Sequence, residues 1–313
     1  MKIVYLGNFR PSFSTENHLA STLEALGHSV IKVQEDEYTN NGRGIYRIVK
    51  LESPDMFLFT RTWGKSLDFE SLNAIKERVT TVSYHLDIYY GLKRDGGIDT
   101  DPFWKTDFVF TPDGDSRSQE WFKSKGINHF YLRPGVFEAE TYIAEPIEAK
   151  NDVIFVGSYF YHEEWPYRQQ LIDWLRTTYG DRFLKYGNPE ITIRGDALNK
   201  LYSNTKVVIG DSLCQNFDHE YYWSDRIYET IGRGGFLIHP YIKGIEDSFE
   251  IDKELITYKY GDFKELKKLI DYYIEHDEER EKIRKSGYER VKKDHTYTNR
   301  LKEMFEVINE KNI

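Results

Sequence analysis

The chain has 313 residues, and its 43 basic and 52 acidic side chains give a formal net charge of −9. Hydrophobic residues make up 39 % of the sequence, which excludes a wholly disordered protein, and at roughly 150 residues per domain the length predicts two domains. The single cysteine excludes an intramolecular disulfide framework and a cysteine-based zinc cluster.

No stretch approaches the roughly 18 apolar residues of a membrane-spanning helix. The N-terminal sequence MKIVYLGNF turns polar too soon for the apolar region of a signal peptide. We therefore expect a cytoplasmic protein without a membrane span, or one in the host cytoplasm if a phage encodes it. The acidic net charge disfavours a general nucleic-acid coat, although it leaves room for a local basic surface.

In the first part of the chain, short apolar runs alternate with helical patterns. Buried strands are predicted at 2–6, 29–33, 55–60, 79–84 and 107–111, and helices at 14–26, 43–52, 67–77 and 115–125. Such alternation predicts a parallel sheet that is covered by helices on both faces.

Residues 134–151 interrupt this alternation with two prolines and an acidic stretch, which predicts a linker. The alternation then restarts, with strands predicted at 152–156, 183–186, 206–210 and 235–239, and helices at 167–179, 197–202, 224–232, 263–293 (a charged pair) and 297–308. We therefore predict an N-terminal Rossmann-like domain (1–148), a second one (149–296), and a last segment (297–313) that packs back on the first.

Open parallel sheets bind ligands at the carboxyl ends of their strands. The loops at these points hold Gly7-Asn8, Arg61-Thr62-Trp63, His85-Leu86-Asp87, Gly157-Ser158, Gly210-Asp211-Ser212 and His239-Pro240. Two such domains facing each other would form a cleft that can exclude water from a reacting bond. The sequence has no GxGxxG, P-loop or GxSxG motif, which disfavours a nicotinamide dehydrogenase, a P-loop enzyme and a serine hydrolase.

The strongest motif is SDRIYETIGRGGFLIHP, at residues 224–240. Arg226 and Glu229 are three residues apart, so they share one face near the start of a predicted helix. A guanidinium there can bind a phosphate with two of its N–H groups, and a carboxylate one turn later can accept both hydroxyls of a ribose. The pair predicts a clamp for a nucleotide diphosphate, with a plain surface Arg–Glu pair as the alternative.

This block, together with the FVGS segment and the arginine that follows it, resembles the C-terminal half of group 1 GT-B glycosyltransferases over roughly residues 150–310. Within that group it is most similar to the spore-maturation-protein branch. The resemblance implies two Rossmann-like domains facing across a cleft and a nucleotide sugar as co-substrate. It places Glu229 on the ribose, and Arg168 and Arg226 on the pyrophosphate. The E-x7-E signature of the group is altered, because Tyr221 stands eight residues before Glu229.

A more remote resemblance, to phage DNA β-glucosyltransferases, extends along more of the chain. The shared features, in order, are an acid opening the first helix (Glu16), an aspartate after a middle strand (Asp87), a Gly-Ser loop followed by an arginine (Gly157, Ser158, Arg168), a strand ending Ile209-Gly210-Asp211, and the Arg226-x-x-Glu229-Thr230 helix. This resemblance implies that Asp87 is the general base. It also makes a hydroxymethylated base in DNA one candidate acceptor, beside a glycan, a protein or a small molecule.

In the N-terminal domain, Asp87 is the predicted base for an acceptor hydroxyl, with His85 as its rival and a helix cap as the alternative role for Asp87. Glu16 is a predicted donor contact, or else an acid favoured by the first helical turn. The predicted acceptor-side residues are Arg61, Trp63, Lys93 and Arg94, because basic and aromatic side chains suit DNA or another anionic acceptor. Solvated helix charges are the alternative there.

In the C-terminal domain, the predicted donor contacts beside the clamp are Gly157, Ser158, Asp211, Ser212 and Tyr186, the last of which would stack on or bond to the uracil of a UDP-sugar. A salt bridge to Glu163 or Glu164 is the alternative for Arg168. We expect no essential metal, because cationic side chains and backbone N–H groups can stabilise the diphosphate, while a role for Mg²⁺ stays open.

The sequence thus predicts a hexosyltransferase that moves glucose or a similar sugar from a UDP-sugar to an acceptor hydroxyl. The outcome is inversion if Asp87 is an in-line base, whereas the group 1 resemblance implies retention. Two alternatives are a nucleotide-sugar epimerase or hydrolase on the same fold, and a non-catalytic nucleotide-sugar-binding protein of a spore or virion. The sequence leaves the sugar, the acceptor and the oligomeric state open.

Overall fold

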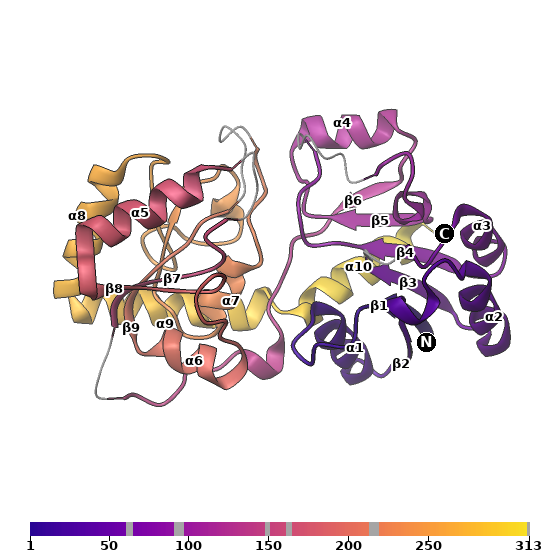
Figure 1. The fold of residues 1–313 in the computed structure, drawn as a ribbon, viewed down its shortest axis with the longest axis horizontal. Coiled ribbons are helices and arrows are strands. Elements are labelled where there is room, and N and C mark those ends of the chain that lie inside the picture. Colours follow the sequence, from indigo (N-terminus) through magenta and orange to yellow (C-terminus); the bar gives the residue numbers. More distant parts are fainter. Residues whose placement is uncertain (61–64, 91–96, 148–150, 161–164, 213–218, 312–313) are drawn as a thin grey trace. The chain divides into compact units, whose positions relative to one another are not determined.

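The computed structural model describes residues 1–60, 65–90, 97–147, 151–160, 165–212 and 219–311. The chain folds into two compact α/β units, which are described separately below (Figure 1). Unit 1 comprises Met1–Arg133 and Tyr297–Ile313, and unit 2 comprises Pro134–Thr296.

Unit 1 is built on a six-stranded parallel sheet with the strand order β2-β1-β3-β4-β5-β6. The strands are β1 (Lys2–Gly7), β2 (Ser29–Gln34), β3 (Met56–Thr60), β4 (Thr80–Tyr84), β5 (Phe108–Thr111) and β6 (His129–Tyr131). The predicted strands are all present. The sequence analysis missed β6, because its three half-buried residues form no continuous apolar run.

Helices cover both faces of this sheet. They are α1 (Thr15–Ala25), α2 (Gly42–Glu52), α3 (Phe69–Lys76), α4 (Ser116–Ser124) and α10 (Tyr297–Lys311). On one face, α2 and α3 bury Ile45 and Leu72 in a cluster with the strand residues Val4 and Phe57. α10, the yellow helix in Figure 1, contacts α1, so the last helix of the chain is part of unit 1.

Unit 2 contains a five-stranded parallel sheet with the order β11-β10-β9-β7-β8. Its strands are β7 (Asn151–Val156), β8 (Phe183–Tyr186), β9 (Thr205–Ile209), β10 (Leu237–Pro240) and β11 (Ile256–Tyr258), and its helices are α5 (Tyr167–Tyr179), α6 (Gly195–Ser203), α7 (Arg226–Gly232), α8 (Phe263–Glu275) and α9 (Asp277–Asp294). The three-residue edge strand β11 was not predicted.

The segment predicted to be a linker belongs to unit 2. Its backbone is tied to α6, because Nδ2 of Asn199 donates to the carbonyls of Glu140 and Tyr142, and the N–H of Ala144 donates to Oγ of Ser203. The division between the units therefore falls at 133/134 rather than at the predicted 148/149. A proline-containing, acidic stretch predicts loop structure correctly but does not reveal which domain the loop packs on.

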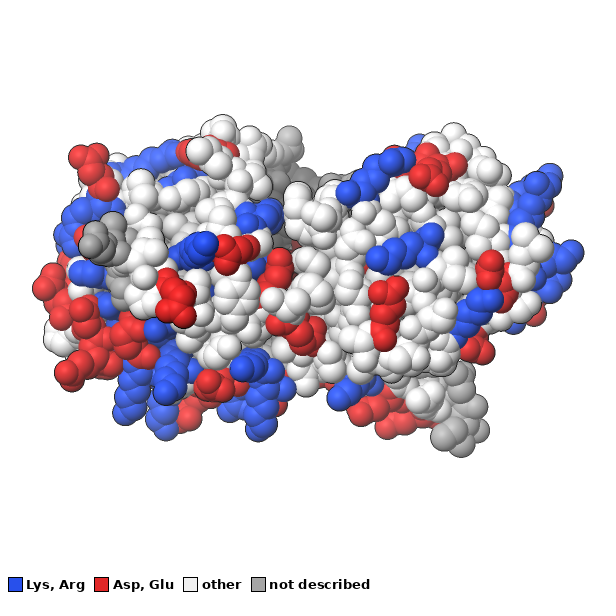
Figure 2. Space-filling view, turned by 90° about the horizontal axis from the view of Figure 1, so that it is seen from below, with Lys and Arg blue, Asp and Glu red and all other residues white. Residues whose placement is uncertain are grey.

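Acidic and basic side chains are interspersed over the part of each unit that Figure 2 shows. In the described parts of the chain, no helix combines the length and the apolar character that crossing a membrane requires.

Candidate functional site

Two arginines converge on the carboxyl end of β7 in unit 2. Nη1 of Arg226, the first residue of α7, donates a 2.6 Å hydrogen bond to the carbonyl of Val156. Nη1 of Arg168, near the start of α5, lies 3.9 Å from the position that a Cβ on Gly157 would occupy. The sequence analysis singled out both arginines and the glycine, and the structure brings them together at one strand end.

A buried aspartate lies between these arginines. Oδ2 of Asp211, just past the end of β9, is 2.6 Å from Nε of Arg168, and Nε1 of Trp165 donates to the same carboxylate at 3.2 Å. Burial raises the pKa of Asp211, and the charges of Arg168 and Arg226 act in the opposite direction. The partner predicted for Arg168, Glu163 or Glu164, lies outside the described residues. The charges of both guanidinium groups thus act on this one carboxylate.

Ser212 holds the region ahead of α7 in place. Its Oγ accepts a 3.0 Å hydrogen bond from the N–H of Ser224 and lies 3.0 Å from Nε2 of His239. Nδ1 of His239 is 2.7 Å from the carbonyl of Pro240, so Nδ1 carries the proton and Nε2 accepts from the serine hydroxyl. Burial lowers the pKa of His239 to about 4, which keeps the ring neutral.

Asp211 and Ser212 were predicted as donor contacts, but their polar atoms bond to protein groups. Only 1 % of Asp211 and 2 % of Ser212 is exposed. In the structure, Asp211 positions Arg168. Ser212, just past the end of β9, contacts His239 in β10 and Ser224, which lies two residues before α7. Their role as donor contacts stays a prediction, and the structure adds that both side chains hold neighbouring protein groups.

Glu229 lies on α7 one turn after Arg226, and 28 % of its side chain is exposed. Its Oε1 is 3.9 Å from Nη2 of Arg233, a buried arginine that also donates to Oδ1 of Asn199 at 2.6 Å and pairs with Glu140. These contacts fix the end of α7 while Glu229 remains partly accessible. The helix itself begins at Arg226 rather than at the predicted Ser224, and it is seven residues long.

The loops after β7 and β8 pack against each other through glycines. The N–H of Gly157 donates to the carbonyl of Tyr186 at 2.8 Å. Gly187 has a φ of +98°, and a Cβ on it would lie 2.7 Å from the carbonyl oxygen of Gly157. Ser158 and Tyr186, two predicted donor contacts, are half-buried beside this backbone contact. A side chain at position 187 would separate the two loops.

In unit 1, the predicted base and its rival lie side by side after β4. Nε2 of His85 is 3.4 Å from Oδ2 of Asp87, and the two side chains are 18 % and 53 % exposed, respectively. The His85 ring packs near Tyr89 and Phe103, with centroid separations of 5.2 Å and 6.2 Å. The histidine is therefore anchored by aromatic rings, and the aspartate is open to solvent.

The sequence analysis missed Asp113, which holds the loop that carries this pair. Its Oδ1 accepts hydrogen bonds from the N–H groups of Tyr89 and Tyr90 at 3.0 Å and 2.9 Å, and its Oδ2 accepts from Oγ1 of Thr111. Burial raises the pKa of Asp113 to about 6. The signal that could have found it is its place just past a strand, two residues after the end of β5.

Glu16 lies in the first turn of α1, next to the end of β1. A Cβ on Gly7 would lie 2.6 Å from Cγ of Glu16 and 2.8 Å from Oγ1 of Thr60, at the end of β3. Burial raises the pKa of Glu16, whereas its backbone hydrogen bond, Thr60 and His85 lower it. The helix cap is Ser14, whose side chain accepts from the N–H of Asn17, so Glu16 is not needed for capping.

The predicted acceptor-side residues Arg61, Trp63, Lys93 and Arg94 lie outside the described residues. Within the described part of the chain, no group of three or more His, Cys, Asp and Glu side chains is arranged to hold a metal ion.

A family model described as glycosyl transferase-like matches residues 168–306, a span that contains Arg168, Arg226 and Glu229. No curated protein matches the sequence. Several solved structures share the fold across the whole chain. A glycosyltransferase from Rickettsia africae ESF-5 is 13 % identical with a TM-score of 0.65, and the similarity covers 99 % of this chain and 98 % of that one.

Two further structures contain nucleotide ligands. Anabaena HepE (Alr3699), in complex with UDP and glucose, is 13 % identical with a TM-score of 0.62, covering 99 % of each chain. An alpha-glucosyltransferase in complex with UDP-glucose and DNA containing an abasic site is 12 % identical with a TM-score of 0.72, covering 98 % of each chain.

These similarities confirm the predicted fold of two Rossmann-like α/β domains. They also confirm the predicted resemblance to GT-B glycosyltransferases, while the spore-maturation branch stays a prediction. Residues 168–306 thus resemble a glycosyl transferase-like family, and the whole chain shares the fold of GT-B glycosyltransferases.

Proposed function

We propose that the chain transfers a sugar from a UDP-sugar to an acceptor hydroxyl, with unit 2 binding the nucleotide diphosphate. The observation that carries this proposal is the convergence of Arg168 and Arg226 on the end of β7, with Asp211 as the buried carboxylate between them. The complexes of similarly folded proteins with UDP and UDP-glucose support the choice of donor.

In this proposal, Arg226 binds the diphosphate directly. The Val156 carbonyl orients its guanidinium, a planar group whose N–H donors match two phosphate oxygens. As the bond between the sugar and the diphosphate breaks, negative charge grows on the leaving group, and a fixed cation stabilises it. Arg168, which pairs with Asp211, lies at the same strand end.

Glu229 and the glycine loops would hold the nucleoside. The partly exposed carboxylate of Glu229 accepts hydroxyl hydrogens of the ribose, one helical turn from the diphosphate. The backbone around Gly157 and Ser158 approaches the ligand closely because Gly187 leaves room there. Tyr186, half-buried at the end of β8, borders the uracil.

On unit 1, Asp87 is the proposed base. It takes the proton of the acceptor hydroxyl while that oxygen bonds to the anomeric carbon, the bond from this carbon to the diphosphate breaks, and UDP leaves. His85, 3.4 Å away, orients the carboxylate. Because 53 % of the Asp87 side chain is exposed, an acceptor can reach it.

The test of donor binding compares two arginines at opposite ends of the same sheet. Arg226→Gln removes the cation at the carboxyl end, whereas Arg182→Gln alters an arginine just before β8 that is 53 % exposed and pairs with Asp152. A bond between an arginine and a phosphate contributes roughly 1.5–3 kcal/mol, so Arg226→Gln should weaken UDP binding about tenfold to a hundredfold. Calorimetry with UDP measures this, and equal UDP affinity of wild type, Arg226→Gln and Arg182→Gln would contradict the proposal.

A further inference from the structure

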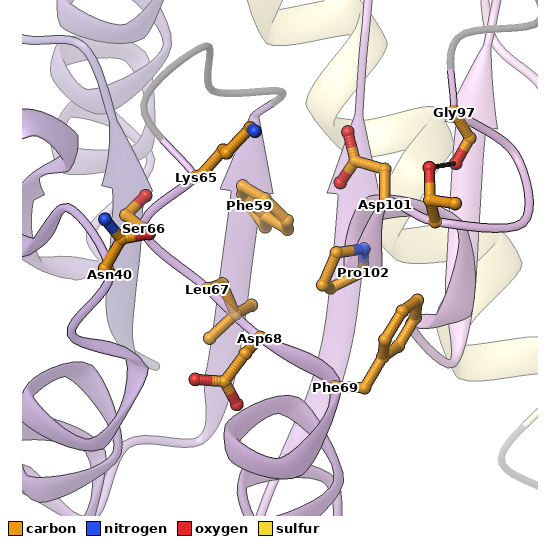
Figure 3. A pocket seen from close by; sticks show the side chains of 11 residues that line it. Asn40, Phe59, Lys65, Ser66, Leu67, Asp68, Phe69, Gly97, Asp101 and Pro102 are labelled. Carbon is orange, nitrogen blue, oxygen red and sulfur yellow. Dashed lines mark hydrogen bonds between the residues drawn. The ribbon is translucent and has the colours of Figure 1, made fainter.

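A cavity of about 590 Å³ opens in unit 1 beyond the end of β3, with Phe59 and Phe69 in its lining (Figure 3). A volume of roughly 300–1,000 Å³ is typical of sites for small ligands. The fully buried ring of Phe103 packs against Phe59 at 5.7 Å and against His85 at 6.2 Å, so it separates this cavity from that histidine. A direct contact to a residue of the proposed site is found instead in unit 2.

That contact is made by Arg233, a buried arginine at the end of α7, four residues after Glu229. Residues four apart in a helix lie on the same face. The N–H of Arg233 donates to the carbonyl of Glu229 at 3.1 Å, and the carbonyl of Arg233 accepts from Oγ of Ser203 at 3.1 Å. Only 2 % of Arg233 is exposed, so its charge has to be compensated by neighbouring protein groups.

The guanidinium of Arg233 is held by groups outside α7. Nη1 donates to Oδ1 of Asn199 at 2.6 Å, and Nη2 donates to Oε2 of Glu140. Asn199 also fixes the segment that carries Glu140, because its Nδ2 donates to the carbonyls of Glu140 and Tyr142 at 2.8 Å and 2.9 Å. The position of the guanidinium is therefore set by α6 and by the segment before β7, rather than by Glu229.

Glu229 lies beside this fixed cation without forming a hydrogen bond to it. Nη2 of Arg233 is 3.9 Å from Oε1 of Glu229, which is beyond the roughly 2.7–3.2 Å of an N–H···O hydrogen bond. Among the described residues, Arg233 is the one salt-bridge partner of the Glu229 carboxylate. Its charge therefore attracts and orients the carboxylate, while the lone pairs of Glu229 stay available for hydroxyl hydrogens.

We propose that Arg233 is a positioning residue that acts through Glu229. Held by Glu140 and Asn199, it draws the carboxylate towards the orientation that accepts the ribose hydroxyls, and so it sets the preference of the site for a donor with an intact ribose. Glu140 is part of this arrangement, because it takes the direct contact with Nη2 that Glu229 would otherwise make. This inference rests on the proposed function, because it concerns the ribose contact of that same donor site.

The experiment measures, by calorimetry on the full chain, the affinities for UDP and for 2′,3′-dideoxy-UDP, which lacks both ribose hydroxyls. The ratio of the two affinities reports the ribose contact, whereas a purely structural role of Arg233 would change both affinities alike. The variants are Arg233→Lys, which keeps the charge but loses the planar fork of N–H donors, and Glu140→Gln, which frees Arg233 to close on Glu229.

The matched control is Arg284→Lys. Arg284 is 14 % exposed and donates to the carbonyl of Gly234, the residue after Arg233, but it pairs with Glu281 instead of Glu229. Two further proteins, Glu229→Ala and Glu229→Ala combined with Arg233→Lys, show whether Arg233 acts through the carboxylate. Urea unfolding checks that each variant is folded.

We expect the wild type to prefer UDP over the dideoxy ligand at least about tenfold. Arg233→Lys and Glu140→Gln should each reduce this preference at least about threefold, while the affinity for the dideoxy ligand changes less than about twofold. Arg284→Lys should keep the wild-type preference. In the Glu229→Ala background, Arg233→Lys should have no further effect on the preference.

A preference that neither Arg233→Lys nor Glu140→Gln changes would overturn the inference, as would an equal loss of affinity for both ligands. If Arg233→Lys does not fold, Glu140→Gln decides, because it leaves the arginine in place. A wild type that binds both ligands equally well lacks the ribose contact, which overturns the inference while UDP binding stands. Failure of the wild type to bind UDP would instead refute the proposed function itself, so the two failures are distinguishable.

Discussion

In each unit a buried aspartate lies just past the end of a strand, Asp113 after β5 and Asp211 after β9, but the two carboxylates are compensated differently. In unit 2, Asp211 pairs with the guanidinium of Arg168. In unit 1, Asp113 accepts hydrogen bonds from two backbone N–H groups and a threonine hydroxyl, and burial raises its pKa to about 6. Unit 2 thus gathers charges where a diphosphate is proposed to bind, and unit 1 gathers neutral hydrogen bonds and aromatic rings.

This difference indicates a division of labour. Unit 2 places a buried ion pair and a second arginine at one strand end, and oriented guanidinium groups suit a ligand with two phosphates. The hydrogen-bonded loop of unit 1 instead holds one solvent-exposed carboxylate, Asp87, beside His85. Changes in unit 2 should therefore affect donor affinity and stability, and changes around Asp87 should affect turnover.

The largest expected effect is that of Asp87→Asn on turnover. A general base contributes roughly 10²–10⁴-fold, so kcat should fall by that factor while UDP affinity stays at the wild-type value. Steady-state kinetics and calorimetry on the same preparation measure both quantities. If the variant keeps activity within about threefold of wild type, Asp87 is not the general base. The proposed division, with turnover depending on unit 1 and donor affinity on unit 2, would then also be wrong.

The buried pair of unit 2 should control stability. Asp211→Asn or Arg168→Met alone removes one partner of this buried ion pair, which costs roughly 3–5 kcal/mol of unfolding free energy. The double variant removes both charges, so it should lose clearly less than the sum of the single losses. Urea unfolding of the four proteins measures the coupling, and strictly additive losses would show that the pair does not act as a unit.

Disrupting the glycine contact between the β7 and β8 loops should have a smaller effect on the free energy of unfolding. Gly187→Ala forces a Cβ to within 2.7 Å of the Gly157 carbonyl oxygen at a φ of +98°, and we expect a loss of about 1–3 kcal/mol together with weaker UDP binding. Gly126→Ala in unit 1 is the control, because φ there is +64° but no atom lies within 4 Å of the added Cβ. If the Gly187 variant and the wild type bind UDP equally well, the contact between the two loops does not contribute to donor binding.

The smallest expected effect is a change of protein stability with pH that comes from Asp113 in unit 1. The pKa of Asp113 is raised by burial from 3.8 to about 6, so between pH 7 and pH 5 the folded protein takes up a proton that the unfolded chain does not. This side chain therefore contributes about 1 kcal/mol more stability at pH 5 than at pH 7, and the contribution is lost as the pH rises through 6.

Asp113→Asn should abolish that contribution. His129, whose pKa burial lowers to about 3, has the opposite effect on acidification, so the informative quantity is the difference between wild type and variant at each pH. Urea unfolding at pH 5 and pH 7 supplies it. The same change in stability between the two pH values in both proteins would mean that Asp113 does not titrate in this range.

The sequence predicts those features of the fold that depend on local pattern. Apolar runs such as 2–6 and 152–156 are buried on both faces of a parallel sheet, so they are recognisable without their partners. The edge strands β6 and β11 have three residues each and are set by pairing with a neighbouring strand, which no local pattern records. The acidic stretch before β7 packs on α6 through contacts between distant residues, which its own sequence does not record, so the sequence predicts only a linker there.

In the candidate site, too, the sequence indicates single residues but not the contacts between residues that are distant in the chain. The sequence singles out Asp87 because it follows a predicted strand, and Arg226 because it stands three residues before Glu229 in a predicted helix. The pairing of Arg168 with Asp211, 43 residues apart, depends on the order of β7 and β9 in the sheet. Asp113 was missed although it also follows a strand, since nothing in its sequence distinguishes a buried, backbone-bonded carboxylate from an exposed turn residue.

The most direct test of the account is a crystal structure of the full chain with UDP. We expect the diphosphate within hydrogen-bonding distance of the Arg226 guanidinium and the ribose hydroxyls against the carboxylate of Glu229, at the ends of β7 and β9. Density for UDP at any other place on the molecule, with Arg226 and Glu229 making no contact to it, would contradict the account.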